Sequence, residues 1–335
     1  MLNFYKILFF STMMIGTLIA IASYSWFSMW IGLEINLLSI IPLLKSPKSL
    51  YSTEAILKYF ITQALASMIL LFAMIYTLNL ELMFMSSNTM MIMLNSALLT
   101  KMGAAPFHAW FPEVMEGLDW NNSMIMMIWQ KIAPMVLFSY NLQMTFFITF
   151  VIITSSIVGG VMGLNQISLR KILAYSSINH ISWMLASMLS LKMIWFWYFS
   201  IYSVISINII SLFKIFNTFS MKQMFMLMNS DKAMKIFLSL NFLSLGGLPP
   251  FLGFFPKWLV INSLTQNNFF SLSLMLIIFT LITIFFYLRL IFPSLTITTN
   301  ENLVISNSPL KFQTMIFNSI SLMGLVICTL TFNFY

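Results

Sequence analysis

Charged residues are scarce in this 335-residue chain, and cysteine is almost absent. Only 7% of the residues are Asp, Glu, Lys or Arg, against about 25% in an average soluble domain. The single cysteine, Cys328, excludes an intramolecular disulfide and any cluster held by several cysteines. Two histidines, His108 and His180, limit haem binding by a histidine pair to one site at most. The chain also lacks a phosphate-binding loop, a dinucleotide-binding motif and a hydrolytic triad.

Hydrophobic residues make up 60% of the chain, and its mean hydropathy is +0.94. Apolar windows of about 20 residues, long enough to cross a membrane, recur along the whole sequence. The sequence therefore predicts an all-α polytopic membrane protein, one membrane domain over 1–335 with about eleven transmembrane helices. Polar loops are expected over 217–235 and 292–311. The expected spans are 4–22, 25–44, 54–78, 84–112, 122–141, 145–165, 172–190, 194–216, 236–259, 269–291 and 312–332.

The net charge of +8 comes from basic residues that are spread over the predicted loops, which does not indicate nucleic-acid binding. With eleven spans, almost all of these loop residues fall on one side of the membrane, and only Lys192 falls on the other. Basic loops stay on the cytoplasm-like side, so we expect the N-terminus there and the C-terminus opposite. The basic loop from Lys214 to Lys235 is a candidate contact for cardiolipin. The residues on the basic side are Lys6, Lys45, Lys48, Arg170, Lys171, Lys214, Lys222, Lys232, Lys235, Arg289 and Lys311.

Glycine and proline interrupt two apolar stretches in the same pattern. The segment Gly103-Ala-Ala-Pro-Phe-His-Ala-Trp-Phe-Pro-Glu113 aligns without gaps to Gly247-Leu-Pro-Pro-Phe-Leu-Gly-Phe-Phe-Pro-Lys257. A break in a membrane helix frees backbone groups that lipid cannot satisfy, so it persists only beside protein or water. Paired breaks at corresponding positions of two halves indicate a transport site near the middle of the bilayer.

Five ionisable side chains fall inside the predicted spans or at the breaks. An ionisable group at the centre of a bilayer costs at least about 2.5–3.5 kcal/mol on insertion scales, so it is rarely there without a role. Burial disfavours the charged form of a lysine, whereas a nearby carboxylate favours it. A lysine that changes between these environments can load and release a proton. If they converge, the five form a candidate proton relay: Glu34, Lys58, Lys101, Lys131 and Lys257.

A structural explanation competes with the relay for several residues. Lys58 lies near the start of its span, where a lysine side chain can reach the interface. Lys131 is too deep for that, and Glu34 can be the structural partner of a lysine. His180 is a further candidate for the relay. It lies among hydroxyl side chains, where hydrogen bonding competes with proton transfer. The acids after the first break are expected at a solvated loop edge: Glu113, Glu116 and Asp119.

Four motifs resemble one family closely, the chain 2 family of mitochondrial NADH:ubiquinone oxidoreductase, respiratory complex I. The resemblance covers nearly the whole chain, and the residue bias is similar to that of an insect or other arthropod mitochondrial gene. The motifs are Trp30-Ile-Gly-Leu-Glu34-Ile-Asn-Leu-Leu38, Leu57-Lys58-Tyr-Phe-Ile-Thr-Gln63-Ala-Leu-Ala-Ser67, Lys101-Met-Gly-Ala-Ala-Pro-Phe-His108-Ala-Trp-Phe-Pro-Glu113 and Arg170-Lys171-Ile-Leu-Ala-Tyr-Ser-Ser-Ile-Asn-His180.

The resemblance implies an antiporter-like, proton-pumping subunit built from inverted five-helix repeats, which here correspond to 25–141 and 145–291, with a further transmembrane helix at 312–332. It implies roles for four of the charged residues. Glu34 matches the family's membrane glutamate, Lys101 its broken-helix lysine, Lys131 its central lysine and Lys257 the lysine that ends the second break.

The same resemblance implies that this chain holds no cofactor, metal or redox centre. NADH, flavin mononucleotide (FMN), iron–sulfur clusters and ubiquinone belong to the whole complex, which is an H⁺-translocating NADH:ubiquinone reductase. The implied partners are other membrane subunits of complex I, including further antiporter-like chains. The implied location is the mitochondrial inner membrane, with the N-terminus on the matrix side and the C-terminus on the intermembrane side.

Two other functions remain open. The chain can be a stand-alone cation/proton antiporter, but Glu34 is its only deep acid, and a hard cation such as Na⁺ needs several oxygen ligands. It can also be a structural membrane scaffold whose charges join helices. Four buried lysines against one buried acid are more charge than adhesion requires.

Overall fold

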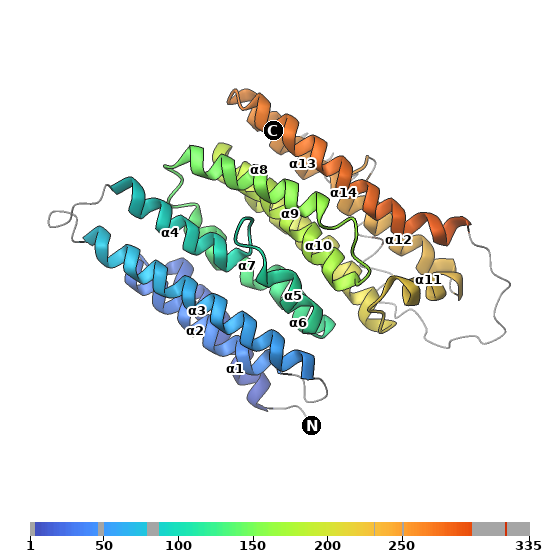
Figure 1. Ribbon diagram of the computed structural model, residues 1–335, viewed down its shortest axis with the longest axis horizontal. Helices are drawn as coiled ribbons and strands as arrows, with labels where there is room; N and C mark the ends of the chain where they lie inside the picture. Colours follow the sequence, from blue (N-terminus) through green and yellow to red (C-terminus); the bar gives the residue numbers. More distant parts are fainter. Residues whose placement is uncertain are drawn as a thin grey trace. The chain divides into compact units, whose positions relative to one another are not determined.

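The computed structural model describes residues 4–45, 50–78, 87–230, 232–249 and 251–296, together with residue 319. Every regular element within these ranges is a helix (Figure 1), apart from an isolated β-bridge between Ser168 and Ser220. The predicted all-α fold is therefore confirmed for the described part of the chain. The helices form two compact units, Met1–Thr154 and Ser155–Tyr335.

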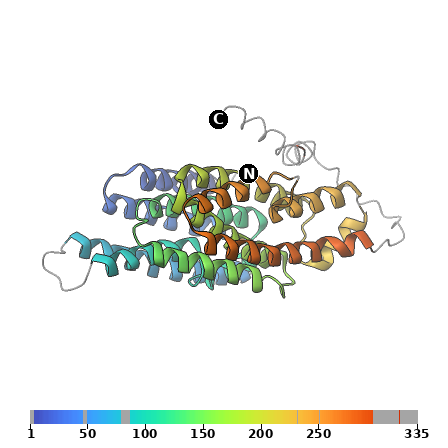
Figure 2. The same ribbon diagram turned by 90° about the horizontal axis from the view of Figure 1, so that it is seen from above.

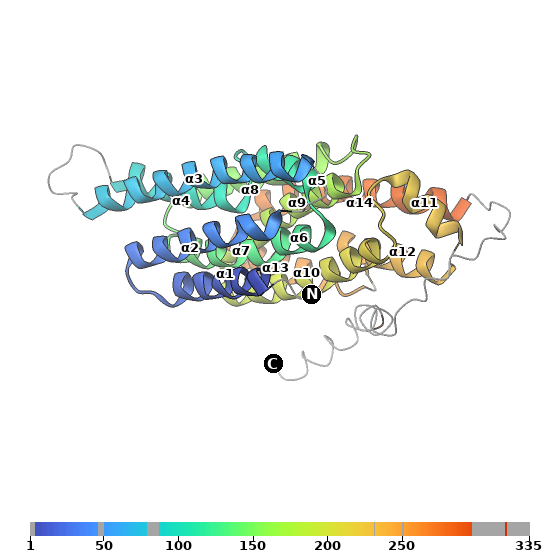
Figure 3. The same cartoon turned by 90° about the horizontal axis from the view of Figure 1, so that it is seen from below.

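The first unit begins with an antiparallel pair, α1 and α2, whose backbones pack closely at Gly16 and Gly32. A Cβ atom on Gly32 would lie 2.5 Å from the backbone nitrogen of Ala20, so only glycine fits there. Figures 2 and 3 show α1 and α2 in one layer of this unit and α3 and α4 in the other. The elements are α1 (Phe4–Ala22), α2 (Trp26–Leu44), α3 (Leu50–Leu78), α4 (Ser87–Met102), α5 (Trp110–Gly117), α6 (Trp120–Met124), a π-helical turn η2 (Ile125–Trp129), α7 (Gln130–Phe138) and α8 (Thr145–Val161), which runs into the second unit.

The second unit is built around α9, which packs against α10, α13 and α14. Every residue of α9 from Ile172 to Met188 is buried, although many of them are Ser, Asn or His. A helix this polar persists in a membrane only when other helices cover it. The elements are α9 (Leu169–Ser190), α10 (Lys192–Ile215), α11 (Met221–Ser230), α12 (Lys232–Gly246), α13 (Phe254–Gln266) and α14 (Phe270–Thr296).

Among the described residues, five helices are long and apolar enough to cross a membrane, and two shorter apolar helices accompany them. The predicted bounds of the first two spans agree with α1 and α2 within one residue. The polar loop expected over 217–235 is wrong in part, because α11 forms there from a short run rich in methionine. The helix expected at 312–332 lies outside the described residues. The five spans are Phe4–Ala22, Trp26–Leu44, Tyr51–Thr77, Lys192–Ile215 and Phe270–Pro293.

Candidate functional site

Both predicted breaks end their first helix in the same backbone turn. Gly103 has φ of 75° and Gly247 has φ of 73°, a left-handed conformation that glycine adopts without steric cost. The N–H of Gly103 donates to the carbonyl of Thr100 at 3.2 Å, and the N–H of Ala104 donates to that of Leu99 at 3.1 Å. The same two bonds recur at the matching positions of α12, at 3.0 and 3.3 Å. Together they make the Schellman turn that closes a helix at glycine.

Side chains satisfy the carbonyl groups that the first break frees. The indole Nε1 of Trp110, at the start of α5, donates to the carbonyl of Thr100 at 3.1 Å. The hydroxyl of Thr154 donates to the carbonyl of Ala105 at 3.1 Å. These neutral donors replace the helical bonds that α4 cannot make, as the absence of water in a membrane core requires.

A lysine takes that role in the second break. Nζ of Lys257 donates to the carbonyl of Gly246 at 2.7 Å, and its aliphatic stem lies directly over Gly247. A Cβ atom on Gly247 would come within 2.7 Å of Cδ of Lys257. The ammonium group therefore sits at the negative end of the α12 dipole, where a cation is stabilised. It also lies 5.8 Å from the ring of Trp183. The matching residue of the first break is Glu113.

Lys101 lines a small polar cavity inside the first unit. The side chain is 7% exposed and lies on the last turn of α4, before the break. The cavity has about 10 Å³ of room for the centre of a water-sized sphere, about enough for one water molecule. Its lining comes from α2, α3, α4 and α7: Leu33, Asn36, Leu37, Tyr59, Gln63, Lys101, Gln130 and Pro134.

Glu34 lies beside this cavity on α2, close enough for its charge to act on both Lys101 and Tyr59. Its Oε1 is buried and has no hydrogen-bond partner among the described residues. Nε2 of Gln63, also buried, lacks an acceptor in the same part of the structure. An unmade bond of this kind costs about 1–3 kcal/mol, and more for a charged group. Gln63 lines the cavity, so its unsatisfied amide and the unsatisfied carboxylate oxygen of Glu34 favour a polar role for this region over inert packing.

Lys131 is 1% exposed and lies on α7, just after the π-helical turn η2. Its Nζ lies 5.4 Å from the centre of the Phe111 ring, which α5 carries into the first break. A cation over an aromatic face is stabilised when water is excluded. Single π-helical turns occur frequently at functional sites. The sequence predicted Lys131 as a relay residue, but no pattern in the sequence indicated the π-helical turn.

His180 lies on α9, in the second unit. Its Nδ1 lies 2.9 Å from the hydroxyl of Tyr198, and the ring of Tyr202 lies 4.9 Å from its own ring. Tyr287 of α14 is close enough to act on both tyrosines. A second small cavity adjoins this group, lined by His180, Tyr198, Ile201, Tyr202, Ile205, Ser244, Leu245, Gly253 and Pro256. Sequence reasoning missed the tyrosines. The spacing of four residues between Tyr198 and Tyr202, on one face of an apolar helix, was the available signal.

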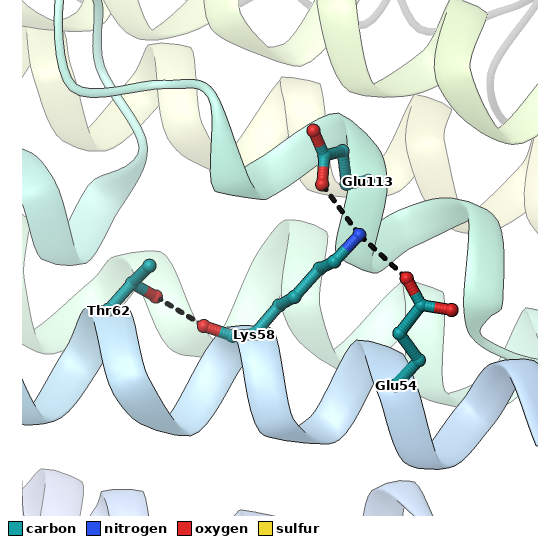
Figure 4. A network of polar contacts seen from close by, with 4 residues as sticks. All are labelled: Glu54, Lys58, Thr62 and Glu113. Carbon is teal, nitrogen blue, oxygen red and sulfur yellow. Dashed lines mark hydrogen bonds and ion pairs between the residues drawn. The ribbon is translucent and has the colours of Figure 1, made fainter.

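Lys58 differs from the other four relay candidates (Figure 4). Its Nζ lies 2.9 Å from Oε1 of Glu54 and 2.8 Å from Oε2 of Glu113, and its side chain is 41% exposed. The two carboxylates compensate its charge, and it does not line the cavity beside Lys101. The expectation that Glu113 lies at a loop edge is wrong, because Glu113 lies in the first turn of α5 and ties that helix to α3.

A family model described as "NADH:quinone oxidoreductase/Mrp antiporter, TM" matches residues 23–283, which include both breaks. NADH-ubiquinone oxidoreductase chain 2 of Anopheles gambiae is 47% identical, over 97% of this chain and 97% of its own. The protein of that name from Aedes aegypti is 48% identical with the same coverage, and that from Loxodonta africana is 42% identical over 88% and 87%. This chain belongs to the NADH-ubiquinone oxidoreductase chain 2 family.

Solved structures share the fold at lower identity. A chain of respiratory complex I from Thermus thermophilus matches with a TM-score of 0.84 at 20% identity, over 96% of this chain and 79% of its own. A chain of an archaeal membrane-bound sulfane sulfur reductase matches with a TM-score of 0.83 at 14% identity, over 97% and 73%. The resemblance read from the four sequence motifs is thus confirmed at the level of the family.

Within the first unit, Lys101 and the α7 helix that carries Lys131 line one cavity, and Glu34 lies close enough for its charge to act on Lys101. Within the second unit, Lys257 and His180 flank the second break. Lys58 lies with Glu54 and Glu113 instead. Among the described residues, no three His, Cys, Asp or Glu side chains gather where they could hold a metal ion.

Proposed function

We propose that this chain is a proton-translocating membrane subunit of NADH:ubiquinone oxidoreductase, respiratory complex I, in the mitochondrial inner membrane. One observation carries the proposal. In a chain of the chain 2 family, each unit has a helix broken by the same glycine turn, and a buried lysine stands at each break. Ionisable groups at such depth are costly and mark ion or proton pathways.

The chemistry of the first unit suits proton transfer. A buried lysine keeps its proton while a carboxylate nearby is charged, and it releases the proton when that carboxylate is neutralised. Glu34 and Lys101 are such a pair, because the charge of Glu34 acts on Lys101, and Lys101 lines a cavity that fits about one water. Lys131 is the next buried cation on the neighbouring helix. Loading Glu34 therefore changes the proton affinity of Lys101, and a shift of charge along this row moves a proton sideways within the unit.

The second unit provides a matching set in which Lys257 and His180 are the proton carriers. Lys257 holds its ammonium on the end of α12, and His180 bonds to the Tyr198 hydroxyl. Both groups are buried, and both have partners that can accept or donate. We assign Lys58 only a supporting role in the relay, because two carboxylates already compensate it.

The proposed layout has about eleven transmembrane helices in one domain, with inverted repeats over 25–141 and 145–291 and a final helix at 312–332. The matching hydrogen bonds at the two breaks support a repeat. The distribution of basic loops supports an N-terminus on the matrix side and a C-terminus on the intermembrane side.

The proposed partners are the other membrane subunits of the complex, including further antiporter-like chains. Cardiolipin is a proposed lipid contact near Lys214 and Lys222, which are exposed around the short helix α11. The whole complex then acts as an H⁺-translocating NADH:ubiquinone reductase. NADH, FMN, the iron–sulfur clusters and ubiquinone act in other subunits, and this chain contributes no cofactor or metal site.

A stand-alone cation/proton antiporter is the second candidate. The description of the family model names the Mrp antiporter, and a chain of an Mrp complex from Dietzia sp. shares the fold with a TM-score of 0.73 at 15% identity, over 83% of this chain and 58% of its own. Purification separates the two candidates. A subunit of complex I copurifies with a large NADH-oxidising assembly, whereas an antiporter is isolated as an active transporter without it. A purely structural scaffold would tolerate neutral residues at Glu34 and Lys131.

The test of proton translocation is Glu34→Gln in the complete complex. The amide keeps the shape of the side chain and removes its proton-accepting charge. We expect normal assembly and normal NADH oxidation with a hydrophilic artificial acceptor. Coupled ubiquinone reduction and proton uptake into vesicles should fall about tenfold or more. Normal pumping by a normally assembled Glu34→Gln complex contradicts the proposal.

A further inference from the structure

Two buried amides join α2 to α7 next to the cavity of the first unit. Nδ2 of Asn36 donates to Oε1 of Gln130 at 3.1 Å, and Nε2 of Gln130 donates back to Oδ1 of Asn36 at 3.0 Å. The side chains are 4% and 9% exposed. A reciprocal bond of this kind fixes the orientation of each amide relative to the other, because turning only one would place N–H against N–H and oxygen against oxygen.

The pair occupies a particular place in the proposed relay. Asn36 follows Glu34 by two residues on α2, and Gln130 directly precedes Lys131 on α7. Both amides line the cavity that Lys101 also lines. Each primary amide has two N–H donors and two acceptor positions, and the reciprocal bonds use one of each. One donor and one acceptor position therefore remain on each side chain beside the cavity.

We propose that Asn36 and Gln130 are positioning residues of the proton relay. The pair holds the helix of Glu34 to the helix of Lys131, and it offers the cavity of Lys101 both a fixed acceptor and a fixed donor. An ammonium group needs acceptors, whereas a neutral amine needs a donor for its lone pair. An amide pair serves both states without taking up a proton itself, which a carboxylate or a lysine in its place would do.

The second unit supports a role for this position. The sequence separation between Gly103 and Gly247 also relates Asn36 to His180 and Lys101 to Leu245. His180 and Leu245 both line the cavity of the second unit, as their counterparts line that of the first. His180 is likewise bonded to a neutral partner from a neighbouring helix, Tyr198. The position thus faces a cavity and carries an interhelical hydrogen bond in both units.

The inference rests on the proposed function, and its test uses the complete complex with an apolar pair, Asn36→Leu with Gln130→Met. Leu has the branched shape of Asn, and Met has about the length of Gln. Because both amides are replaced, neither is left unpaired and the unit should assemble. We expect NADH oxidation with an artificial acceptor to stay at the wild-type rate. Coupled ubiquinone reduction and proton pumping should fall about tenfold. The exchanged pair, Asn36→Gln with Gln130→Asn, keeps a reciprocal bond and should recover at least about a third of the wild-type rate.

A matched control exists in the same unit. Asn95 and Asn141 also share two buried hydrogen bonds, both at 3.1 Å, and neither residue lines the cavity. Asn95→Leu with Asn141→Leu should lower thermal stability and leave the number of protons pumped per NADH unchanged. A structural role for every buried amide pair predicts the same result for both pairs, whereas positioning of the relay predicts a pumping defect only for Asn36 and Gln130.

Lys101→Met in the same assay distinguishes a failure of the inference on the amides from a failure of the proposed function. If Lys101→Met abolishes pumping and the apolar pair pumps normally, the inference on the amides is overturned and the proposed function stands. If Lys101→Met also pumps normally, the proposed function itself fails. If the complex that carries the apolar pair does not assemble, the complex that carries the exchanged pair tests the inference instead. Assembly with pumping supports the inference, and assembly without pumping, or no assembly, overturns it.

Discussion

The two broken helices have the same backbone and different charges. Gly103 and Gly247 close α4 and α12 with matching hydrogen bonds, and a proline lies in the first turn of the helix that follows each break. Carbonyl groups at the break accept hydrogen bonds from Trp110 and Thr154 in the first break and from Lys257 in the second. The comparison teaches that the sequence repeat preserves a way of ending a membrane helix, and that charge is placed on it separately.

The cavities of the two units also differ in the charged residues that line them. In the first unit the charged residue of the broken helix, Lys101, lines the cavity. In the second unit its counterpart is Leu245, and Lys257 reaches the helix end from the far side of the break. The first unit thus combines a lysine with a carboxylate, whereas the second combines a lysine with histidine and tyrosine. In the proposed relay each unit supplies a proton carrier, and the chemistry of the carriers differs.

Substitutions at the matching positions 257 and 113 are expected to show the largest difference between the two breaks in their effect on pumping and stability. Lys257→Met removes both a buried cation and the donor to the carbonyl of Gly246, which costs about 1–3 kcal/mol for the unsatisfied group. We expect proton pumping to fall about tenfold or more and thermal stability to fall with it. Glu113→Gln, at a half-exposed site, should leave both close to wild type. Equal effects at the two positions would contradict the comparison.

A smaller difference is expected at the two glycines. Alanine at either position costs about 1–2 kcal/mol, because its φ is positive in both breaks. Gly247→Ala should cost more than Gly103→Ala. The new methyl group would lie 2.7 Å from Cδ of Lys257 in the second break and 3.2 Å from Cβ of Phe111 in the first. Thermal inactivation of the purified complex shows which of the two substitutions lowers stability more. A larger loss for Gly103→Ala would show that the Lys257 side chain moves aside from Gly247 at little cost.

A third test concerns the partner of His180 in the second unit. Tyr198→Phe keeps the ring and removes the hydroxyl that lies 2.9 Å from Nδ1 of His180. We expect assembly to be retained and coupled ubiquinone reduction to fall about three- to tenfold, the size expected for one lost hydrogen bond. Tyr24→Phe, at a fully exposed tyrosine of the first unit, is the control and should change nothing. A normal rate for Tyr198→Phe removes this tyrosine from the account.

The smallest effect is expected at Lys58. Its ion pairs with Glu54 and Glu113 are half-exposed, and pairs of this kind contribute little. Lys58→Met should leave pumping within about twofold of wild type. A tenfold loss in an assembled complex would place Lys58 in the relay, as the sequence predicted.

The sequence was informative where one local rule dominates. Long apolar runs predicted α1 and α2 within one residue, and the Gly–Pro pattern located both breaks. The expected span over 84–112 still ran through the first break, although α4 ends at Met102 and α5 begins at Trp110. Hydropathy cannot detect this, because Gly103 and the residues after it are apolar. The broken helix has 16 residues in α4 and 8 in α5, so the pair also reads as one span by length alone.

Features that depend on contacts between helices were not predictable. Nothing local indicates that Asn36 pairs with Gln130, or that Glu113 turns to Lys58, since these partners meet only through packing. The helix α11 was missed because its apolar residues are too few to span a membrane and are interrupted by Lys222 and Gln223. Conversely, depth in an apolar run identified Lys131 as buried, and it is 1% exposed.

The central claim is that the buried lysines of this chain carry protons, and Lys131→Ala tests it most directly. The measurement is the number of protons pumped per NADH oxidised by the assembled complex in sealed vesicles. The account predicts a lower ratio or a loss of coupled turnover, with assembly and artificial-acceptor activity unchanged. A normal ratio in a normally assembled Lys131→Ala complex would contradict it.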